Sequence, residues 1–176
     1  LPLTRNGVAV GALMLYADEV NAFDEEISKL LLEMATDISF AIDNFAREAE
    51  REANEKQLRK LSQALEQSLE SIVITDVDAH IEYVNEAFVQ TTGYSREEVI
   101  GQNPRILNSG HTPPETFAAM WDAMQQGQPW KGEFCNRRKD GSEYVEFAII
   151  TPLRQADGSI SHYVAVKEDI TEKKRN

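Results

Sequence analysis

The chain has 176 residues, enough at roughly 150 residues per domain for one complete domain and part of another. Hydrophobic residues make up 41% and charged residues 27%, which excludes a disordered or collagen-like protein. The net charge is -12, so nucleic acids and anionic membranes are not expected partners. The single cysteine excludes an internal disulfide and indicates a reducing cytoplasm. No apolar run is long enough for a membrane-spanning helix, so this segment predicts no membrane insertion.

The first predicted element is a buried strand over residues 8–16, where apolar residues follow one another without interruption. Residues 17–70 contain no second strand that could pair with it. An isolated strand is not stable in water. We therefore expect residues 1–45 to be the C-terminal fragment of a larger domain whose sheet lies upstream.

A long helix is predicted from about residue 23 to residue 69, because no proline or glycine interrupts this stretch. Asn21 or Asp24 can cap its first turn. Apolar residues recur at helical spacing in two series that differ by one residue in phase; they are Ile27, Leu31, Met34, Ile38, Ala41 and Phe45, then Leu58, Leu61, Leu65 and Ile72. The phase shift falls in the charged stretch 47–56. Such a stripe predicts a parallel homodimer, and a helix folded back on its own chain is the alternative.

From residue 71 onward, short strands and short helices replace the long helix. Strands are predicted at 72–75, 81–84, 130–137, 143–153 and 160–168, and helices at 86–92, after Ser95, at 113–126 and from Thr171. Asn85 can cap the helix at 86–92, and Ser95 and Glu98 form the spacing of a capping box. Two strands, several helices and three further strands predict an α+β domain.

Several short motifs in this region resemble those of PAS domains. They are Ile74-Thr75-Asp76, Tyr83 to Phe88, Thr92 to Ser95, Gly101 to Pro104, Lys139-Asp140-Gly141 and Asp169-Ile170-Thr171. The resemblance covers residues 68–172 and implies a five-stranded antiparallel sheet with helices over one face and a small-molecule pocket. Residues 1–50 resemble the end of a GAF domain. The implied organisation is a GAF fragment at 1–45, a helical signalling linker at 46–70, a PAS sensor at 71–170 and the start of an output helix at 171–176.

One part of the PAS region resembles the flavin-binding PAS domain of the nitrogen-fixation redox regulator. Its residues are Asn103 to Gly110, Trp121, Pro129-Trp130 and Asn136 to Lys139. The resemblance implies an FAD between helices and sheet, with Trp121 near the isoalloxazine ring and Asn136 at its pyrimidine edge. Arg105 is then placed for the phosphates, and Asn108 belongs to the same segment. An unidentified small molecule is the alternative ligand.

Strand alternation places Glu146 and Lys167 on the same sheet face as Asn136. Burying opposite charges unpaired is costly, so we expect them to pair with each other or with a polar ligand. A bulge that releases both to solvent is the alternative. Flavin-binding relatives carry neutral amides at these two positions, which weakens the case for FAD. The opposite face is apolar and predicts cover by a helix or a second subunit; its residues are Val145, Phe147, Ile149, Val164 and Val166.

Other chemistries find no support in the sequence. Blue-light (LOV) domains carry a reactive cysteine at the Pro104 position, whereas Cys135 is expected on the opposite sheet face from Asn136, so no flavin adduct is expected. Haem is not expected because residues 113–126 contain no histidine, and the three histidines show no metal-ligand spacing. No nucleophile elbow or phosphate loop is present, so this segment is not expected to be an enzyme.

The predicted function is that of a sensory module in a bacterial signalling protein. A change in ligand or redox state is expected to alter the hydrogen bonds around Asp169 and Thr171 and so to bias a downstream helix. The resemblance implies a diguanylate cyclase, a cyclic-di-GMP phosphodiesterase or a two-component histidine kinase as the output. The alternative is a ligand-free PAS domain that only dimerises and relays strain, its pocket filled by Trp121, Tyr144 and Lys167.

Overall fold

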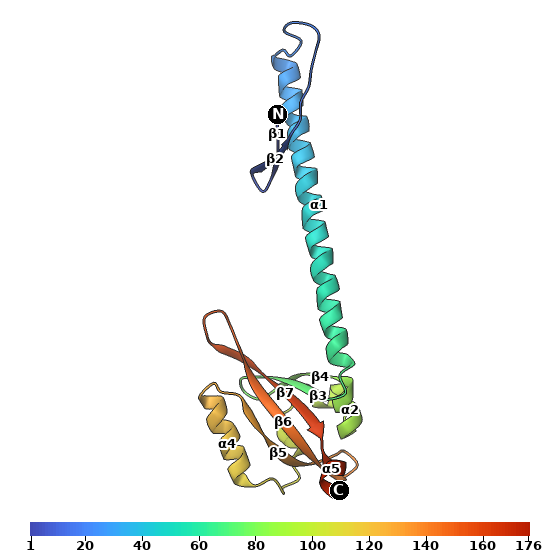
Figure 1. Ribbon diagram of the computed structural model, residues 1–176, viewed down its shortest axis with the longest axis vertical. Helices are drawn as coiled ribbons and strands as arrows, with labels where there is room; N and C mark the ends of the chain where they lie inside the picture. The colour runs from blue at the N-terminus through green and yellow to red at the C-terminus, as the bar shows by residue number, and fades with distance from the viewer. The chain divides into compact units, whose positions relative to one another are not determined.

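The computed structural model describes residues 1–176, which divide into two compact units, 1–60 and 61–176 (Figure 1). The first unit opens with a two-stranded antiparallel sheet formed by β1 (Pro2–Arg5) and β2 (Val8–Ala12). No helix of the protein combines the length and the apolar character that a membrane crossing requires.

The prediction of an unpaired strand over residues 8–16 is wrong in two respects: the strand is shorter, and it has a partner. It ends at Ala12 and pairs with the short strand that precedes it in the chain. Asn6 and Gly7 connect the two strands with positive φ angles of 51° and 77°. An Asn-Gly pair between two strands is a strong hairpin signal, because these residues tolerate positive φ. The hairpin could therefore have been predicted from the first twelve residues.

Helix α1 spans Glu25–Glu66 without interruption, which confirms the long helix predicted from the absence of proline and glycine. The backbone N–H of Ile27 donates to Asp24 Oδ1 at 2.8 Å, so Asp24 caps the first turn. The β1–β2 hairpin is hydrogen-bonded to this helix. In particular, the Thr4 N–H donates to Ser39 Oγ at 2.9 Å.

The apolar stripe of α1 is largely exposed in a single chain. Phe45, Leu58 and Leu61 are 76%, 66% and 53% exposed, and the only buried residues of the helix are Ala35 and Ser39. Large apolar side chains repeated along a helix and left in water normally mark an interaction surface. The monomer therefore leaves this surface without a partner.

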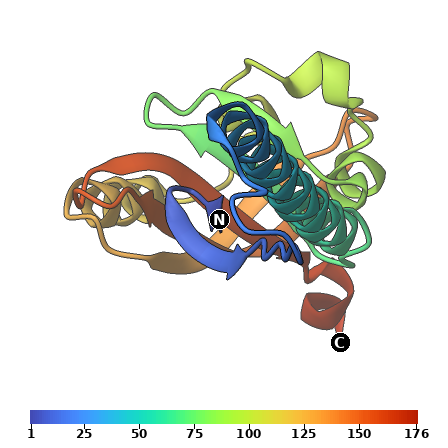
Figure 2. The same ribbon diagram turned by 90° about the horizontal axis from the view of Figure 1, so that it is seen from above.

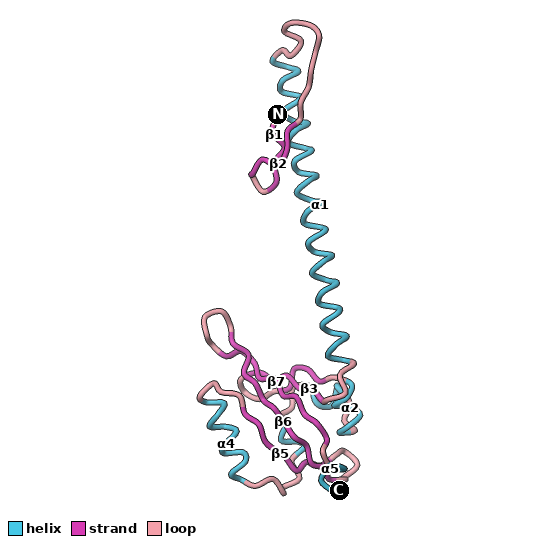
Figure 3. Tube along the Cα trace, in the orientation of Figure 1, coloured by secondary structure: helices cyan, strands magenta, loops and turns pink.

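The second unit is built on a five-stranded antiparallel sheet, as the sequence predicts. Its strands are β3 (Ser71–Asp76), β4 (Ile81–Val84), β5 (Trp130–Arg137), β6 (Glu143–Arg154) and β7 (Ile160–Asp169). They lie in the order β4-β3-β7-β6-β5, so β4 and β5 form the two edges (Figure 3). Three of the four neighbouring pairs join strands consecutive in sequence, and the pairing of β3 with β7 brings the two ends of the unit together.

Short helices connect β4 to β5 and follow β7. They are α2 (Glu86–Thr92), α3 (Arg96–Val99), the 3-10 helix η1 (Pro104–Leu107), α4 (Pro114–Gln125) and α5 (Thr171–Arg175). The predicted capping box at Ser95 and Glu98 is present, with both reciprocal hydrogen bonds. Gly93 ends α2 with a φ of 79°, a conformation that glycine adopts without steric cost. The chain runs from β7 almost directly into α5 (Figure 2).

The apolar core of this unit lies between β3, β4 and the first helices. It contains Val73, Ile81, Val84, Phe88, Val99 and Leu107. Each of these side chains is at most 2% exposed. The core is displaced toward the β4 edge of the sheet, and α4 packs against β5 at the other edge. This division leaves room for a cavity between α4, η1 and the middle of the sheet.

Candidate functional site

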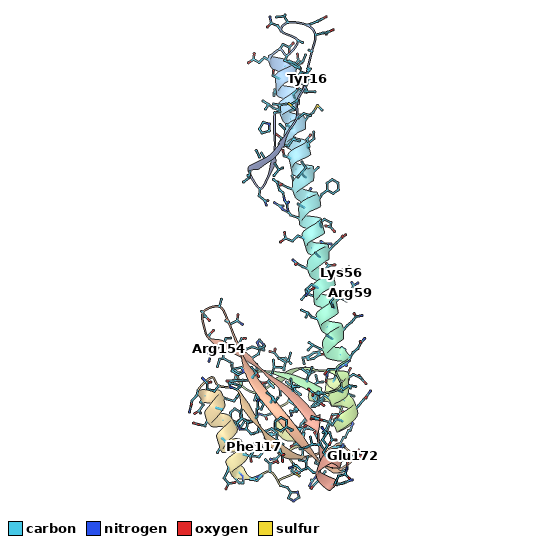
Figure 4. The ribbon with its side chains drawn as sticks, in the orientation of Figure 1. Tyr16, Lys56, Arg59, Phe117, Arg154 and Glu172 are labelled. Atoms are coloured by element: carbon cyan, nitrogen blue, oxygen red, sulfur yellow. The ribbon has the colours of Figure 1, made fainter.

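The second unit contains a cavity of about 330 Å³ between the helices and the inner face of the sheet. Its apolar lining comes mainly from α4 and the central strands, and includes Phe117, Met120, Met124, Phe134 and Ile150. The Phe117 ring, labelled in Figure 4, stacks on the Phe134 ring with the two centroids 5.6 Å apart, and this contact holds α4 against β5. The volume lies at the low end of the range typical of small-molecule sites, and a mostly apolar lining with a few polar groups is characteristic of them.

A buried ion pair forms part of the polar side of this cavity. Lys167 Nζ lies 3.0 Å from Glu146 Oε1, and these side chains are only 8% and 3% exposed. The Asn136 side-chain amide donates to the same Glu146 oxygen at 2.7 Å. The pairing agrees with the expectation from strand alternation, since the three residues come from β7, β6 and β5 and share one face. The alternative of a bulge that exposes both charges is wrong.

The Tyr144 hydroxyl is buried close to this ion pair and has no hydrogen-bond partner. Tyr144 lies opposite Asn136 in the β5–β6 register, and the guanidinium carbon of Arg138 lies 4.5 Å from the centroid of its ring. Burial raises the pKa of this phenol, and the Glu146 carboxylate raises it further. The hydroxyl is therefore protonated and uncharged at physiological pH. Tyr144 is fully buried on the inner face of the sheet and does not line the cavity that remains.

Most of the residues proposed from sequence gather around one cavity. Arg105, Asn108, Trp121, Asn136 and Lys167 line it. Glu146 does not, but it lies behind the wall as the partner of two residues that do. Trp121 is 47% exposed, so it borders the cavity rather than filling it.

Sequence reasoning missed a group of lining residues from β3, the turn after it, the start of η1 and β7. They are Val73, Thr75, Ala79, Asn103, Pro104, Tyr163 and Ala165. Alternation along β7 could have added Tyr163 and Ala165, because both share a face with Lys167. The contribution of Ala79 depends on how the β3–β4 turn folds over the sheet, which no local pattern indicates.

The end of α1 is hydrogen-bonded to the β4–α2 junction. Asn85 is fully buried and makes four hydrogen bonds: its Oδ1 accepts from the N–H groups of Ile72 (2.9 Å) and Phe88 (3.1 Å), and its Nδ2 donates to the carbonyls of Leu65 (3.0 Å) and Glu70 (2.9 Å). One side chain thus ties the last turn of α1 to β3 and to the first turn of α2. Sequence reasoning identified Asn85 only as a helix cap.

A second contact to the same helix end is ionic. The guanidinium of Arg96 donates to Glu66 Oε2 at 2.6 Å, and the Tyr83 hydroxyl donates to Glu66 Oε1 at 2.6 Å. Desolvation raises the pKa of Tyr83 to about 12, and its hydrogen bond to Glu66 acts in the same direction. Tyr83 therefore stays protonated and keeps donating to Glu66 at physiological pH.

The other end of the sheet is hydrogen-bonded to α5. Asp169 Oδ1 accepts from the backbone N–H (3.0 Å) and the hydroxyl (2.5 Å) of Thr171, and Asp169 Oδ2 accepts from Arg138 at 2.5 Å. The N–H of Val145 donates to the Thr171 hydroxyl oxygen at 2.9 Å. In the β6–β7 register Asp169 lies directly opposite Glu146. Glu146 of the buried ion pair therefore lies beside Asp169, the residue that is hydrogen-bonded to the first turn of α5.

Comparison with known proteins identifies the family to which most of the second unit belongs. Residues 69–172 match the family described as PAS domain. The nitrogen fixation regulatory protein of Klebsiella oxytoca is 42% identical over 107 residues, which are 61% of this chain and 22% of that protein. Blue-light-activated histidine kinase 1 of Erythrobacter litoralis is 32% identical over 95 residues, 54% of this chain and 26% of the kinase. The chain thus spans about a quarter or less of either relative.

Solved structures agree with this assignment. The light-state structure of the blue-light photoreceptor Aureochrome1 LOV superposes with a TM-score of 0.57 and 30% identity, covering 64% of this chain and 90% of that one. The five-stranded antiparallel sheet and the helices over its inner face are thus shared by both proteins. The family match covers more than half of the chain. The chain therefore belongs to the PAS domain family.

Proposed function

We propose that this chain is the sensory part of a bacterial signalling protein of the cytoplasm, in which the PAS cavity binds a flavin. The PAS domain itself is a sensory domain and is not catalytic. The observation that carries the proposal is the cavity, which combines an aromatic and methionine lining with a polar edge at Asn136 and Lys167. A flavin has the matching shape and chemistry, a flat aromatic ring system with polar groups along one edge.

The residues around the cavity fit such a ligand in two ways. Phe117 and Trp121 from α4 supply aromatic surface on one side, and the sheet supplies the other. Arg105 is exposed at the rim, where its guanidinium can bind phosphate groups outside the cavity. The names of relatives point in the same direction, since they include a blue-light-activated kinase and a LOV photoreceptor.

The proposed relay follows from the register of β6 and β7. A ligand that attracts Lys167 or Asn136 weakens their bonds to Glu146, and Glu146 lies opposite Asp169. Asp169 in turn holds Thr171 in the first turn of α5. We infer that the ligand state is passed along this route to a helix that leads to an output domain, such as a diguanylate cyclase, a phosphodiesterase or a histidine kinase.

An absorption spectrum of the purified protein, before and after addition of FAD, tests the ligand. We expect the two absorption bands of a bound flavin in the natural chain and their loss in Ala165→Met, because the added side chain occupies the cavity beside the polar edge. Ala118→Met is the matched control, since Ala118 lies on α4, is exposed and does not line the cavity. Equal flavin binding by both variants would place the flavin elsewhere and contradict the proposal.

One observation favours a second function. Asn136 and Lys167 are already satisfied by Glu146 without any ligand. A PAS domain of this kind can act as a ligand-free module that dimerises and relays strain. A protein that remains colourless after addition of FAD, in the natural chain and in both variants, supports this second function instead.

We further propose that the chain works as a parallel homodimer through the apolar stripe of α1 and the outer face of the sheet. The stripe is exposed, and the outer-face residues Val145, Phe147, Ile149, Val164 and Val166 remain only half-buried. A second copy of the chain is a suitable partner for each of these surfaces. In this proposal residues 1–45 are the end of a GAF domain and residues 46–70 the signalling linker.

Changing the stripe to charged residues is expected to dissociate the dimer. Leu58→Glu/Leu61→Glu puts two carboxylates on each α1 helix of the dimer. The carboxylates of the two copies repel one another, and the apolar contacts of the two leucines are lost. Arg59, labelled in Figure 4, follows Leu58 in the sequence, and Arg59→Glu is the matched control because it changes the net charge by the same amount. Light scattering coupled to size exclusion should show a monomer for the first variant and a dimer for the control. A natural chain that is already monomeric at high concentration would contradict the dimer.

A further inference from the structure

Three side chains with different metal-ligating groups meet at the β5 edge of the sheet. His111 comes from the loop before α4, Cys135 from β5 and Glu143 from β6. Their ligand atoms all lie within 4.8 Å of one another. The sequence shows no metal-ligand spacing at these positions, because the loop reaches the other two residues only in the folded domain. We propose that His111, Cys135 and Glu143 form a binding site for a divalent zinc-type cation.

The distances suit a single ion. His111 Nδ1 lies 2.9 Å from Glu143 Oε1, and Cys135 Sγ lies 4.0 Å from Glu143 Oε2. Zinc binds nitrogen, sulfur and oxygen at about 2.0–2.3 Å, so the ligand atoms of a tetrahedral site lie roughly 3.3–3.8 Å apart. Small side-chain rotations are enough to bring the three atoms to this spacing. An imidazole, a thiolate and a carboxylate together are ligands that zinc prefers over magnesium or calcium.

The backbone around the three residues is already held in place. Cys135 lies on an edge strand, and its N–H donates to Thr112 Oγ1 at 2.9 Å while its carbonyl accepts from Ser109 Oγ at 2.5 Å. The loop that carries His111 is thereby fixed to the strand that carries Cys135. Glu143 and Cys135 are diagonal neighbours, because Cys135 pairs with Val145 in the β5–β6 register. Binding a metal therefore requires little ordering of the chain.

The charges of the cluster are compatible with a cation. A thiolate and a carboxylate carry two negative charges, which a divalent ion neutralises. Arg137 is the one cation seen in contact with them, 3.4 Å from Glu143 Oε1 and half exposed, so it can turn to solvent when a metal binds. With three protein ligands, a fourth position stays open for water. The site is separate from the cavity, and the inference does not depend on the proposed flavin.

Titration of the reduced, purified chain with Co²⁺, and then with Zn²⁺, tests this site. We expect one equivalent of Co²⁺ to produce the near-ultraviolet charge-transfer band of a cobalt–thiolate bond, and Zn²⁺ to displace it. Cys135→Ser should abolish the band. His111→Ala should weaken binding at least about tenfold, because even the loss of an outer contact to a metal ligand costs that much.

His80→Ala is the control, because His80 belongs to a second group of potential ligands, with Asp76 and Asp78 in the β3–β4 turn. It should bind Co²⁺ like the natural chain. Three results would overturn the proposal: no thiolate band at excess Co²⁺, a band whose affinity His111→Ala leaves unchanged, or binding that His80→Ala removes. Far-ultraviolet circular dichroism of each variant, compared with the natural chain, verifies that the domain has folded.

Discussion

Lys167→Met is expected to lower the free energy of unfolding of the PAS domain by about 3–5 kcal/mol, the usual cost of removing one partner of a buried ion pair. The reason is the position of Glu146, whose side chain is 3% exposed and whose nearest counter-charge is Lys167 Nζ at 3.0 Å. Methionine fills the space of the lysine stem but leaves the carboxylate uncompensated. Urea unfolding followed by tryptophan fluorescence measures the effect, because Trp121 and Trp130 both lie in this domain.

The double variant Lys167→Met/Glu146→Gln separates the charge effect from packing. Glutamine keeps an oxygen that can accept the hydrogen bond from Asn136, and no charge remains buried. We expect the double variant to recover most of the loss, since replacing a whole buried pair by neutral groups is often close to neutral. Lys131→Met is the matched control: Lys131 is exposed on β5, and its replacement should change stability by less than about 0.5 kcal/mol. A double variant no more stable than Lys167→Met alone would show that the pair is not coupled.

The second large effect is expected at Asn85, where replacement by alanine should destabilise the PAS domain by about 2–5 kcal/mol. The change removes the cap of α2, worth about 0.5–2 kcal/mol, and leaves the buried N–H of Ile72 without its partner, at a cost of about 1–3 kcal/mol. The part-buried carbonyls of Leu65 and Glu70 also lose the amide that donates to them. The same fluorescence-detected urea unfolding measures the loss.

Asn85→Asp distinguishes the two roles of this residue. Aspartate caps a helix as well as asparagine does, so a purely local role predicts nearly full stability. We expect no such rescue, because a carboxylate would face the carbonyl oxygens of Leu65 and Glu70 in place of an amide donor. Ser95→Ala is the control for capping alone and should cost about 1 kcal/mol. Full stability of Asn85→Asp would contradict the role of Asn85 in holding the end of α1.

Both predictions bear on the relay proposed above. Asn85 and the Glu66–Arg96 pair connect the incoming helix to the domain, and Asp169 connects the domain to α5. The buried pair of Lys167 and Glu146 lies next to the second of these connections. A variant that disturbs this pair should therefore affect α5 as well as the cavity.

Local patterns in the sequence were sufficient for nearly all elements. Alternation and turn residues predicted the five strands of the sheet, and capping signals predicted the starts of α2 and α3 correctly. These features are local, because each depends on residues within a few positions of one another. The same alternation predicted that Glu146 and Lys167 share a face, since side chains of neighbouring strands follow the same period of two. The β1–β2 hairpin was missed although Asn6-Gly7 is also a local signal.

The sequence by itself determined the class of fold, the long uninterrupted helix and the identity of the polar residues on the inner sheet face. Only the tertiary structure decided which distant side chains meet: Glu66 with Arg96, and His111 with Cys135 and Glu143. It also decided that the buried charges pair with each other and that Tyr144 lies outside the cavity. The physical reason is that such contacts depend on strand order and on the path of loops, which arise from packing of the whole domain rather than from the preferences of neighbouring residues.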